Sequence, residues 1–330
     1  MPSSKPAFFF SATQSVDDRL GDVFSFTWAS YAGLRELWWQ VRGFKEQFPS
    51  LHINEIENKF LSGLPMPGGI DFQNIFLKTE WPAHEREFSK WLLFEACTLY
   101  EGWAEKICGD IFSASNSDKY AKALQFPGGT KPNGQPTGYT AVVAAANSNP
   151  SGLMVNEFLP KLKSSKLNCW STINDQLIAY RFFKECRNSF IHSDGEVTQD
   201  VIDRYVALSQ VQSKQPSPFR HMFAMPPQTI GKKIELHLKD CTLFATLVRK
   251  LICTFDAALC VSDASERLLE ARLRALVTTS TKSTKWINLP KDPSKREQRI
   301  HRMLAASRIP EPANVANVIA WMQAKNVIKL

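Results

Sequence analysis

Three residues near the end of one apolar segment have side chains that could cut a phosphodiester bond. Arg187, Asn188 and His192 lie within YRFFKECRNSFIHSDG, which spans residues 180–195. Arginine is a fixed cation whose fork binds phosphate oxygens, and histidine can accept and donate a proton near neutral pH. Such groups could cleave RNA without a metal. The histidine would deprotonate the ribose 2′-hydroxyl or protonate the departing 5′-oxygen, while the arginine stabilises the phosphate, leaving a 2′,3′-cyclic phosphate and a 5′-hydroxyl.

The spacing of Arg187 and His192 sets a geometric condition. Five residues at about 100° each place the two side chains about 140° apart around a helix, so they do not converge unless the last turn unwinds. A second copy of the chain related by a two-fold axis would bring both pairs into one cleft. The negative end of the helix dipole also favours a protonated His192, which suits a general acid. We therefore expect a homodimer with a composite site.

The spacing alone does not decide between catalysis and a structural role. Arg296 and His301, in REQRIH, have the same separation. That copy lacks the Asn and no apolar helix leads into it, so we interpret it as surface charge. For Arg187 and His192, the structural alternative is a helix end with a solvated arginine and a capping histidine.

The motif requires a helix to position it, and one is expected over residues 174–192. Apolar residues recur there every three or four positions, and Gly195 is a typical helix stop. Helical spacing resumes over residues 197–211, which predicts a helix, a tight turn and a second helix.

A long helix is expected to begin near Pro82, because an apolar stripe runs from Phe88 to Ile107. Its Glu95, Glu101 and Glu105 could be catalytic carboxylates, but solvated or ion-paired positions are commoner on a helix. The remaining predicted helices cover residues 24–48, 52–61, 151–163, 243–261, 266–277, 295–307 and 313–324.

Two segments are expected to be non-helical within this all-α fold. Residues 126–138 are rich in Gly, Pro and Asn and lack a phosphate-binding glycine pattern, so they predict a loop. Alternation around HMFAM and IELHL, over residues 221–238, predicts a small β-hairpin. The predicted regions are an N-terminal arm (1–20), a helical domain (21–265) with a loop insertion at about 113–150, and a basic helical C-terminal region (266–330).

The stretch RNSFIHSDG, preceded by FFKEC and followed by a helix, resembles the signature of the HEPN superfamily (higher eukaryotes and prokaryotes nucleotide-binding). That signature is an Arg, four to six residues and a His, often with a polar residue directly after the Arg. FSKWLLFEACTLYEGWAEKICGDIF looks like the long helix that pairs with the motif helix, and the hairpin before a final apolar helix is similar to some bacterial members. The resemblance covers about residues 21–262, and only the short motif is specific.

The resemblance implies an α-helical bundle that dimerises into a metal-independent endoribonuclease site. Arg187 and His192 would be the catalytic pair, and Asn188 the orienting neighbour. Bacterial members are often toxins or abortive-infection effectors that cut tRNA, rRNA or mRNA, whereas other members only bind RNA or act as scaffolds. The insertion and the C-terminal region depart from any common pattern. The expected partners are RNA and a second copy of the chain, with an antitoxin or regulatory protein as a further candidate.

Positive charge is concentrated at the C-terminal end. Residues 267–330 hold 13 Lys and Arg against four Asp and Glu, a net +9 within a chain of net +8. This imbalance suggests a polyanionic partner, nucleic acid before a membrane surface, although a solvated basic surface is also possible. A helix-turn-helix over residues 295–324 is disfavoured by its proline-rich IPEP turn. The candidate RNA-binding residues are Lys282, Lys285, Trp286, Lys295, Arg296, Arg299 and Arg302.

The composition predicts an ordered globular protein of a reducing cytosol. Apolar residues make up 44% of the 330 residues, and the seven cysteines form no C-x-x-C pair, so we expect buried thiols without disulfides, metal or cofactor. The start of the chain is too polar for a signal peptide, and we expect no membrane span.

Overall fold

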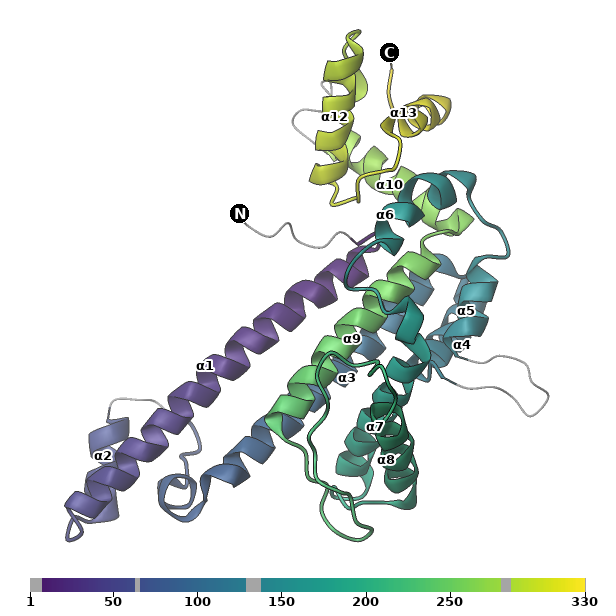
Figure 1. Cartoon of the computed structure of the whole chain (residues 1–330). Coiled ribbons are helices and arrows are strands. Elements are labelled where there is room, and N and C mark those ends of the chain that lie inside the picture. Colours follow the sequence, from purple (N-terminus) through teal and green to yellow (C-terminus); the bar gives the residue numbers. More distant parts are fainter. Residues whose placement is uncertain (1–7, 63–65, 129–137, 280–285, 330) are drawn as a thin grey trace.

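The computed structural model describes residues 8–62, 66–128, 138–279 and 286–329. The protein is mostly helical (Figure 1), and the described residues contain only three isolated β-bridges and no strand. This confirms the predicted all-α class. Within the described residues, no helix is long and apolar enough to cross a membrane.

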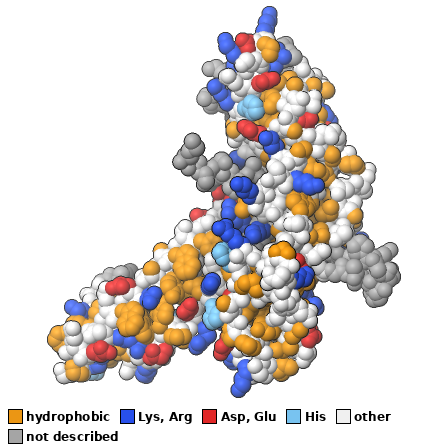
Figure 2. Space-filling model, in the orientation of Figure 1, with side chains coloured by type: hydrophobic (Ala, Val, Ile, Leu, Met, Phe, Trp, Pro, Cys, Tyr) orange, Lys and Arg blue, Asp and Glu red, His pale blue; other side chains and the backbone are white. Residues whose placement is uncertain are grey.

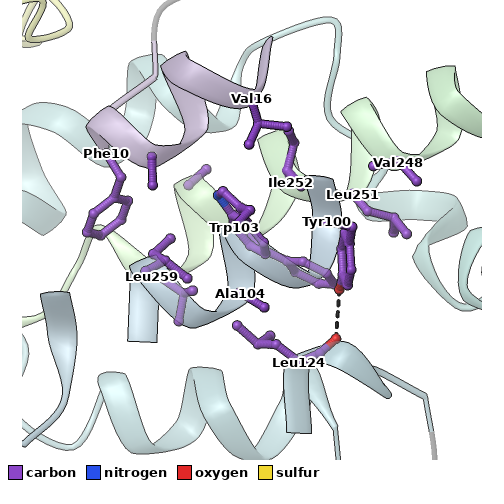
Figure 3. Close-up of a cluster of buried hydrophobic side chains, with 14 of the residues drawn as sticks. Phe10, Val16, Tyr100, Trp103, Ala104, Leu124, Val248, Leu251, Ile252 and Leu259 are labelled. Carbon is purple, nitrogen blue, oxygen red and sulfur yellow. Dashed lines mark hydrogen bonds between the residues drawn. The ribbon is translucent and has the colours of Figure 1, made fainter. Parts of the chain in front are cut away.

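Helices α3 (Trp81–Ile111) and α9 (Leu238–Leu259) form the centre of the molecule, and the long α1 (Ser11–Gln47) lies against both (Figure 1). Their contact faces are apolar and fully buried, and Figure 3 shows Trp103 and Tyr100 of α3 between residues of the other two helices. The indole N–H of Trp103 donates to Thr13 Oγ1 at 2.9 Å, and the Tyr100 hydroxyl donates to the carbonyl of Leu124 at 2.9 Å. Burial of these large rings therefore leaves their polar atoms hydrogen-bonded.

A second, smaller core lies at the far end of α1. There α2 (Ile53–Leu61) and the π-helical turn η1 (Asn74–Lys78) pack on the last turns of α1 around Trp38, Val41 and Ile56. Figure 2 shows hydrophobic side chains on the surface of this projecting end. The exposed large hydrophobic side chains of α1 and its C-cap are Phe26, Trp28, Trp39 and Phe48.

The motif helix α7 (Ile173–His192) packs beside α9 and α3, and a tight turn leads from it to α8 (Gln199–Gln212), which packs on α7 (Figure 1). This confirms the predicted helix, turn and helix. The short elements η2 (Met154–Phe158), α6 (Leu159–Lys163) and η3 (Trp170–Thr172) precede α7.

Helices α10 (Asp263–Thr279), α12 (Pro293–Ala306) and α13 (Val315–Ala324) form the C-terminal region. They share one continuous hydrophobic core with the body. Two acidic side chains fix their position. Glu157 of η2 accepts from the Asn314 N–H at 2.7 Å and from the Asn317 amide at 2.7 Å, and Glu266 accepts from the Trp321 indole at 2.8 Å.

Two boundary predictions are corrected. The expected arm of residues 1–20 is helical from Ser11 onward, and Phe8, Phe9 and Phe10 are buried. The Asp256 carboxylate accepts hydrogen bonds from the backbone N–H groups of Phe9 and Phe10, at 2.8 and 3.1 Å, and these bonds fix the start of α1. The expected loop insertion contains α4 (Ala114–Gln125) and α5 (Tyr139–Ala146), which pack on α3 and α9.

The predicted hairpin over residues 221–238 is wrong, because this segment contains no strand. Side chains take the place of a backbone ladder. The Gln228 amide donates to the Glu235 carbonyl at 3.1 Å, and Asp240 accepts from the Ala224 N–H at 2.7 Å. Two backbone groups of the segment, the Glu235 carbonyl and the Ala224 N–H, are thus bonded by side chains.

Candidate functional site

The predicted motif occupies the last turns of α7, and its helix does not unwind before His192. The Ser193 N–H donates to the Ser189 carbonyl at 2.8 Å, as expected for a regular helix end. Arg187 and His192 therefore keep the separation of about 140° that a regular helix imposes. Within one chain, the structure brings Arg187 together with Asn188 but not with His192.

A tight turn fixes the position of His192. Asp194 and Gly195 both adopt positive φ angles, 49° and 72°, and the Gly195 N–H donates to the Ser189 carbonyl at 3.0 Å. A Cβ atom on Gly195 would lie 2.7 Å from the Phe190 ring, so only glycine fits. The Asp194 carboxylate also pairs with Lys233 at 2.7 Å.

Arg187 is held between α3 and α7. Its Nη2 atom donates to Glu101 Oε2 at 3.1 Å, and its Nη1 atom donates to Asn188 Oδ1 at 3.3 Å. Its side chain is 20% exposed, while its Nε atom is buried without a hydrogen-bond partner among the described residues. The guanidinium is thus oriented by Glu101 and Asn188, and its Nε–H is a buried donor without a partner among the described residues.

Glu101 also binds a second cation. Lys184 Nζ lies 3.2 Å from Glu101 Oε1 and donates to the Gln125 carbonyl at 2.7 Å. Burial lowers the pKa of Lys184, and the nearby Glu101 carboxylate opposes that shift. Glu101 therefore links Lys184 and Arg187, one turn apart on α7.

His192 is exposed, and within the described residues no hydrogen bond or ion pair engages its ring. It lies on the same stripe of α7 as Arg181, Glu185 and Asn188, because spacings of three and four residues repeat one face. Arg181 pairs with Glu185 at 2.5 Å, and the Asn188 amide donates to Glu185 at 3.4 Å. A polar network thus connects the middle of α7 to the motif.

Sequence reasoning missed the roles of Glu101 and Lys184. Glu101 was expected to be solvated or ion-paired, and it is ion-paired, but its partner Arg187 could not be identified from one sequence. The Lys184 and Arg187 pair, three residues apart, is the signal that could have indicated a shared acidic partner.

The C-terminal candidates differ in their surroundings. Lys295 and Arg302 are exposed on α12. Arg296 and Arg299 donate to backbone carbonyls, Arg296 to Pro290 at 3.2 Å and Arg299 to Asn288 at 3.0 Å. Trp286 is half-buried against the main core, and Lys282 and Lys285 lie outside the described residues.

The second Arg and His pair with the same spacing, Arg296 and His301, has different surroundings from the motif. His301 Nδ1 lies 3.7 Å from a carboxylate oxygen of Glu311, whereas Arg296 is engaged by backbone carbonyls. This is consistent with the interpretation of Arg296 and His301 as a surface pair.

The seven cysteines are buried and free, as predicted. Burial raises the pKa of the Cys97 thiol, which lies close to Glu101, to about 12. Within the described residues, no group of three His, Cys, Asp or Glu side chains could hold a metal ion.

The chain matches no family model, no curated protein and no solved structure.

Proposed function

We propose that this protein is a metal-independent endoribonuclease of the HEPN type that acts as a homodimer. The observation that carries the proposal is the arrangement of Arg187 and His192 at the end of α7. Arg187 is oriented by Glu101 and Asn188, and His192 is exposed about 1.4 turns further along the same helix.

In the proposed reaction, a ribose 2′-oxygen attacks the neighbouring phosphorus. A bond forms between the 2′-oxygen and phosphorus, and the bond from phosphorus to the 5′-oxygen breaks. One His192 accepts the proton of the 2′-hydroxyl, and a protonated His192 returns a proton to the departing 5′-oxygen. Arg187 binds the non-bridging oxygens, where charge builds up during the reaction.

The position of the two side chains supports the proposed dimer. Arg187 faces α3 through Glu101, and His192 faces solvent, so a single copy does not present both to one phosphate. Two copies of the α7 end across a two-fold axis would place one acid and one base in the same cleft. Lys295 and Arg302 on α12 would hold the RNA backbone. The biological role we propose is that of a toxin or antiphage effector in the cytoplasm.

The test uses the full chain, total RNA and EDTA. Wild type is expected to shorten the RNA and leave 2′,3′-cyclic phosphate ends, and His192→Ala is expected to leave it intact. His301→Ala is the matched control, because it removes the histidine of the second Arg and His pair with the same spacing. Equal RNA loss in all three proteins, or none with wild type, would remove the proposed activity.

The second candidate function is an RNA-binding or scaffold protein without catalysis. The exposed cations of α12 favour nucleic-acid binding independently of the motif. RNA binding by wild type and by His192→Ala with equal affinity, and without cyclic-phosphate ends, would support this alternative.

A further inference from the structure

A pocket of about 510 Å³ opens between α7, α8 and the segment that follows α4. This volume lies within the range of about 300–1,000 Å³ that is usual for small-ligand sites. One part of its lining is apolar, from Phe126, Leu177, Ile178 and Ala207, and another part carries the guanidinium groups of Arg181 and Arg204. The pocket thus combines a surface for a flat ring with two groups that bind anions.

The exposed Phe126 side chain is held in place by its neighbours. Lys184 Nζ lies 3.8 Å and the Arg181 guanidinium carbon 5.0 Å from the centre of its ring. The preceding carbonyl, that of Gln125, accepts from Lys184 at 2.7 Å and from the Tyr180 hydroxyl at 3.4 Å. This wall of the pocket is therefore fixed before a ligand binds, which lowers the entropy cost of binding.

The two guanidinium groups differ in whether a neighbouring side chain pairs with them. Arg181 is paired with Glu185 at 2.5 Å. Arg204 is exposed on α8, and no ion pair or hydrogen bond to it occurs within the described residues. Arg204 is thus the cation best placed to bind a phosphate in bidentate fashion.

The pocket lies on the face of α7 that carries Asn188 and His192, whereas Arg187 faces α3. Asn174, Ile178 and Arg181 line it, and Glu185, Asn188 and His192 continue the same stripe at spacings of three and four residues. Arg181 and His192 are eleven residues apart, or about 16 Å along the helix axis. A bound RNA strand would cover that distance within a few nucleotides.

We infer that this pocket binds one nucleotide unit, with the base against the apolar wall and the phosphate at Arg181 and Arg204. As a subsite for the strand that His192 cuts, it rests on the proposed ribonuclease function. The same chemistry would accept a free nucleotide. The Asn174 amide, at the rim, can donate to or accept from the edge of the base.

The test measures binding in full-length His192→Ala, so that RNA is not consumed. The probes are a short fluorescein-labelled RNA oligonucleotide, followed by fluorescence anisotropy, and AMP and UMP, followed by calorimetry. Arg204→Gln removes the free cation, and Ile178→Trp fills the pocket. Each is expected to weaken RNA binding about tenfold, since a charge-assisted phosphate contact or one stacked base contributes that much. Arg220→Gln removes an exposed arginine outside the pocket lining and should change the affinity less than about twofold.

The probes separate the two sources of the ligand. Weaker RNA binding with unchanged mononucleotide binding identifies a strand subsite, and weaker binding of AMP or UMP as well identifies a free nucleotide as a sufficient ligand. Unchanged affinity for all three probes in both pocket variants, or no binding of any probe to the parent, overturns the inference. If wild type leaves RNA intact but Arg204→Gln still weakens RNA binding, the subsite stands and the ribonuclease function fails. If wild type cleaves RNA but both pocket variants bind every probe with unchanged affinity, the ribonuclease function stands and the subsite fails.

Discussion

Glu101 of α3 and Arg187 of α7 form an ion pair at 3.1 Å, which joins the motif helix to the central helix of the fold. The same carboxylate holds Lys184, whose side chain is 3% exposed, at 3.2 Å. Because a buried cation without a partner is costly, removal of the Glu101 carboxylate would destabilise the fold as well as release Arg187. Both consequences can be measured.

Glu101→Gln is expected to lower RNA cleavage about tenfold, because Arg187 loses the carboxylate that orients it. The affinity for RNA should stay equal or rise, since one negative charge beside the motif is removed. The free energy of unfolding should fall by about 2 kcal/mol, because Lys184 loses its charged partner. Cleavage rate, anisotropy and urea unfolding measure the three effects.

Glu105→Gln is the control for that variant. Glu105 lies one turn further along α3, is exposed, and accepts only from the Gln125 amide, at 3.1 Å, among the described contacts. It should leave cleavage unchanged. Equal cleavage by Glu101→Gln and wild type would show that Arg187 needs no orientation by Glu101.

Gly195→Ala is expected to destabilise the turn after His192 by more than the usual cost of positive φ. At Gly195, φ is 72° and a Cβ atom would lie 2.7 Å from the Phe190 ring. Gly231→Ala provides a matched control, since its φ is 73° and nothing lies within 4 Å of its Cβ position. Urea unfolding should show a loss of about 1 kcal/mol for Gly231→Ala and at least about 2 kcal/mol for Gly195→Ala. Equal losses would mean that Phe190 moves aside without cost.

Local sequence patterns were enough to predict most of the helices. The periodicity of residues 174–192 and the stop at Gly195 predicted α7 and α8 to within about two residues, because these signals are short-range. The start of α1 was missed because it depends on Asp256. This residue accepts hydrogen bonds from the Phe9 and Phe10 N–H groups, which lie about 250 residues away in sequence. A contact of that separation leaves no local pattern.

The candidate site was proposed from local sequence for the same reason. Arg187, Asn188 and His192 are close in sequence, and the chemistry inferred from their types stays a prediction. Glu101 comes from another helix, and one sequence does not reveal which of several glutamates faces the motif. The predicted hairpin is absent from residues 221–238, where the Gln228 and Asp240 side chains bond the Glu235 carbonyl and the Ala224 N–H in place of a strand ladder.

Asp256 is expected to make stability depend on pH between about pH 4 and pH 6. Burial raises the pKa of its carboxyl from 3.8 to about 6, although Thr13, the Phe9 and Phe10 N–H groups and Arg272 act in the opposite direction. The folded state therefore binds a proton more tightly than the unfolded state, so the contribution of this group is fully present below about pH 4 and is lost as the pH rises through about 6.

The corresponding measurement compares wild type with Asp256→Asn, whose amide stays neutral at every pH. The free energy of unfolding of wild type relative to the variant should fall by roughly 3 kcal/mol from about pH 4 to about pH 7, since one pKa unit corresponds to about 1.4 kcal/mol. A difference that stays constant across this range would show that Asp256 is charged in the folded protein throughout.

Lys295 and Arg302 are expected to contribute to RNA affinity through charge alone, because both are exposed on α12. The double variant Lys295→Gln, Arg302→Gln should bind RNA more weakly at low salt, and the slope of log affinity against log salt should shrink by about one to two. Cleavage at saturating RNA should be unchanged, since neither side chain belongs to the α7 end.

Two comparisons separate this charge effect from structural damage. Lys106→Gln, an exposed lysine of α3, should leave the salt slope almost unchanged. Arg296→Gln should instead lower the stability of the C-terminal region, because it removes donors to the Pro290 and Lys291 carbonyls at 3.2 and 3.0 Å. A salt slope that is the same in wild type and the double variant would place the RNA away from α12. The binding path would then have to run along α7 and α8 alone.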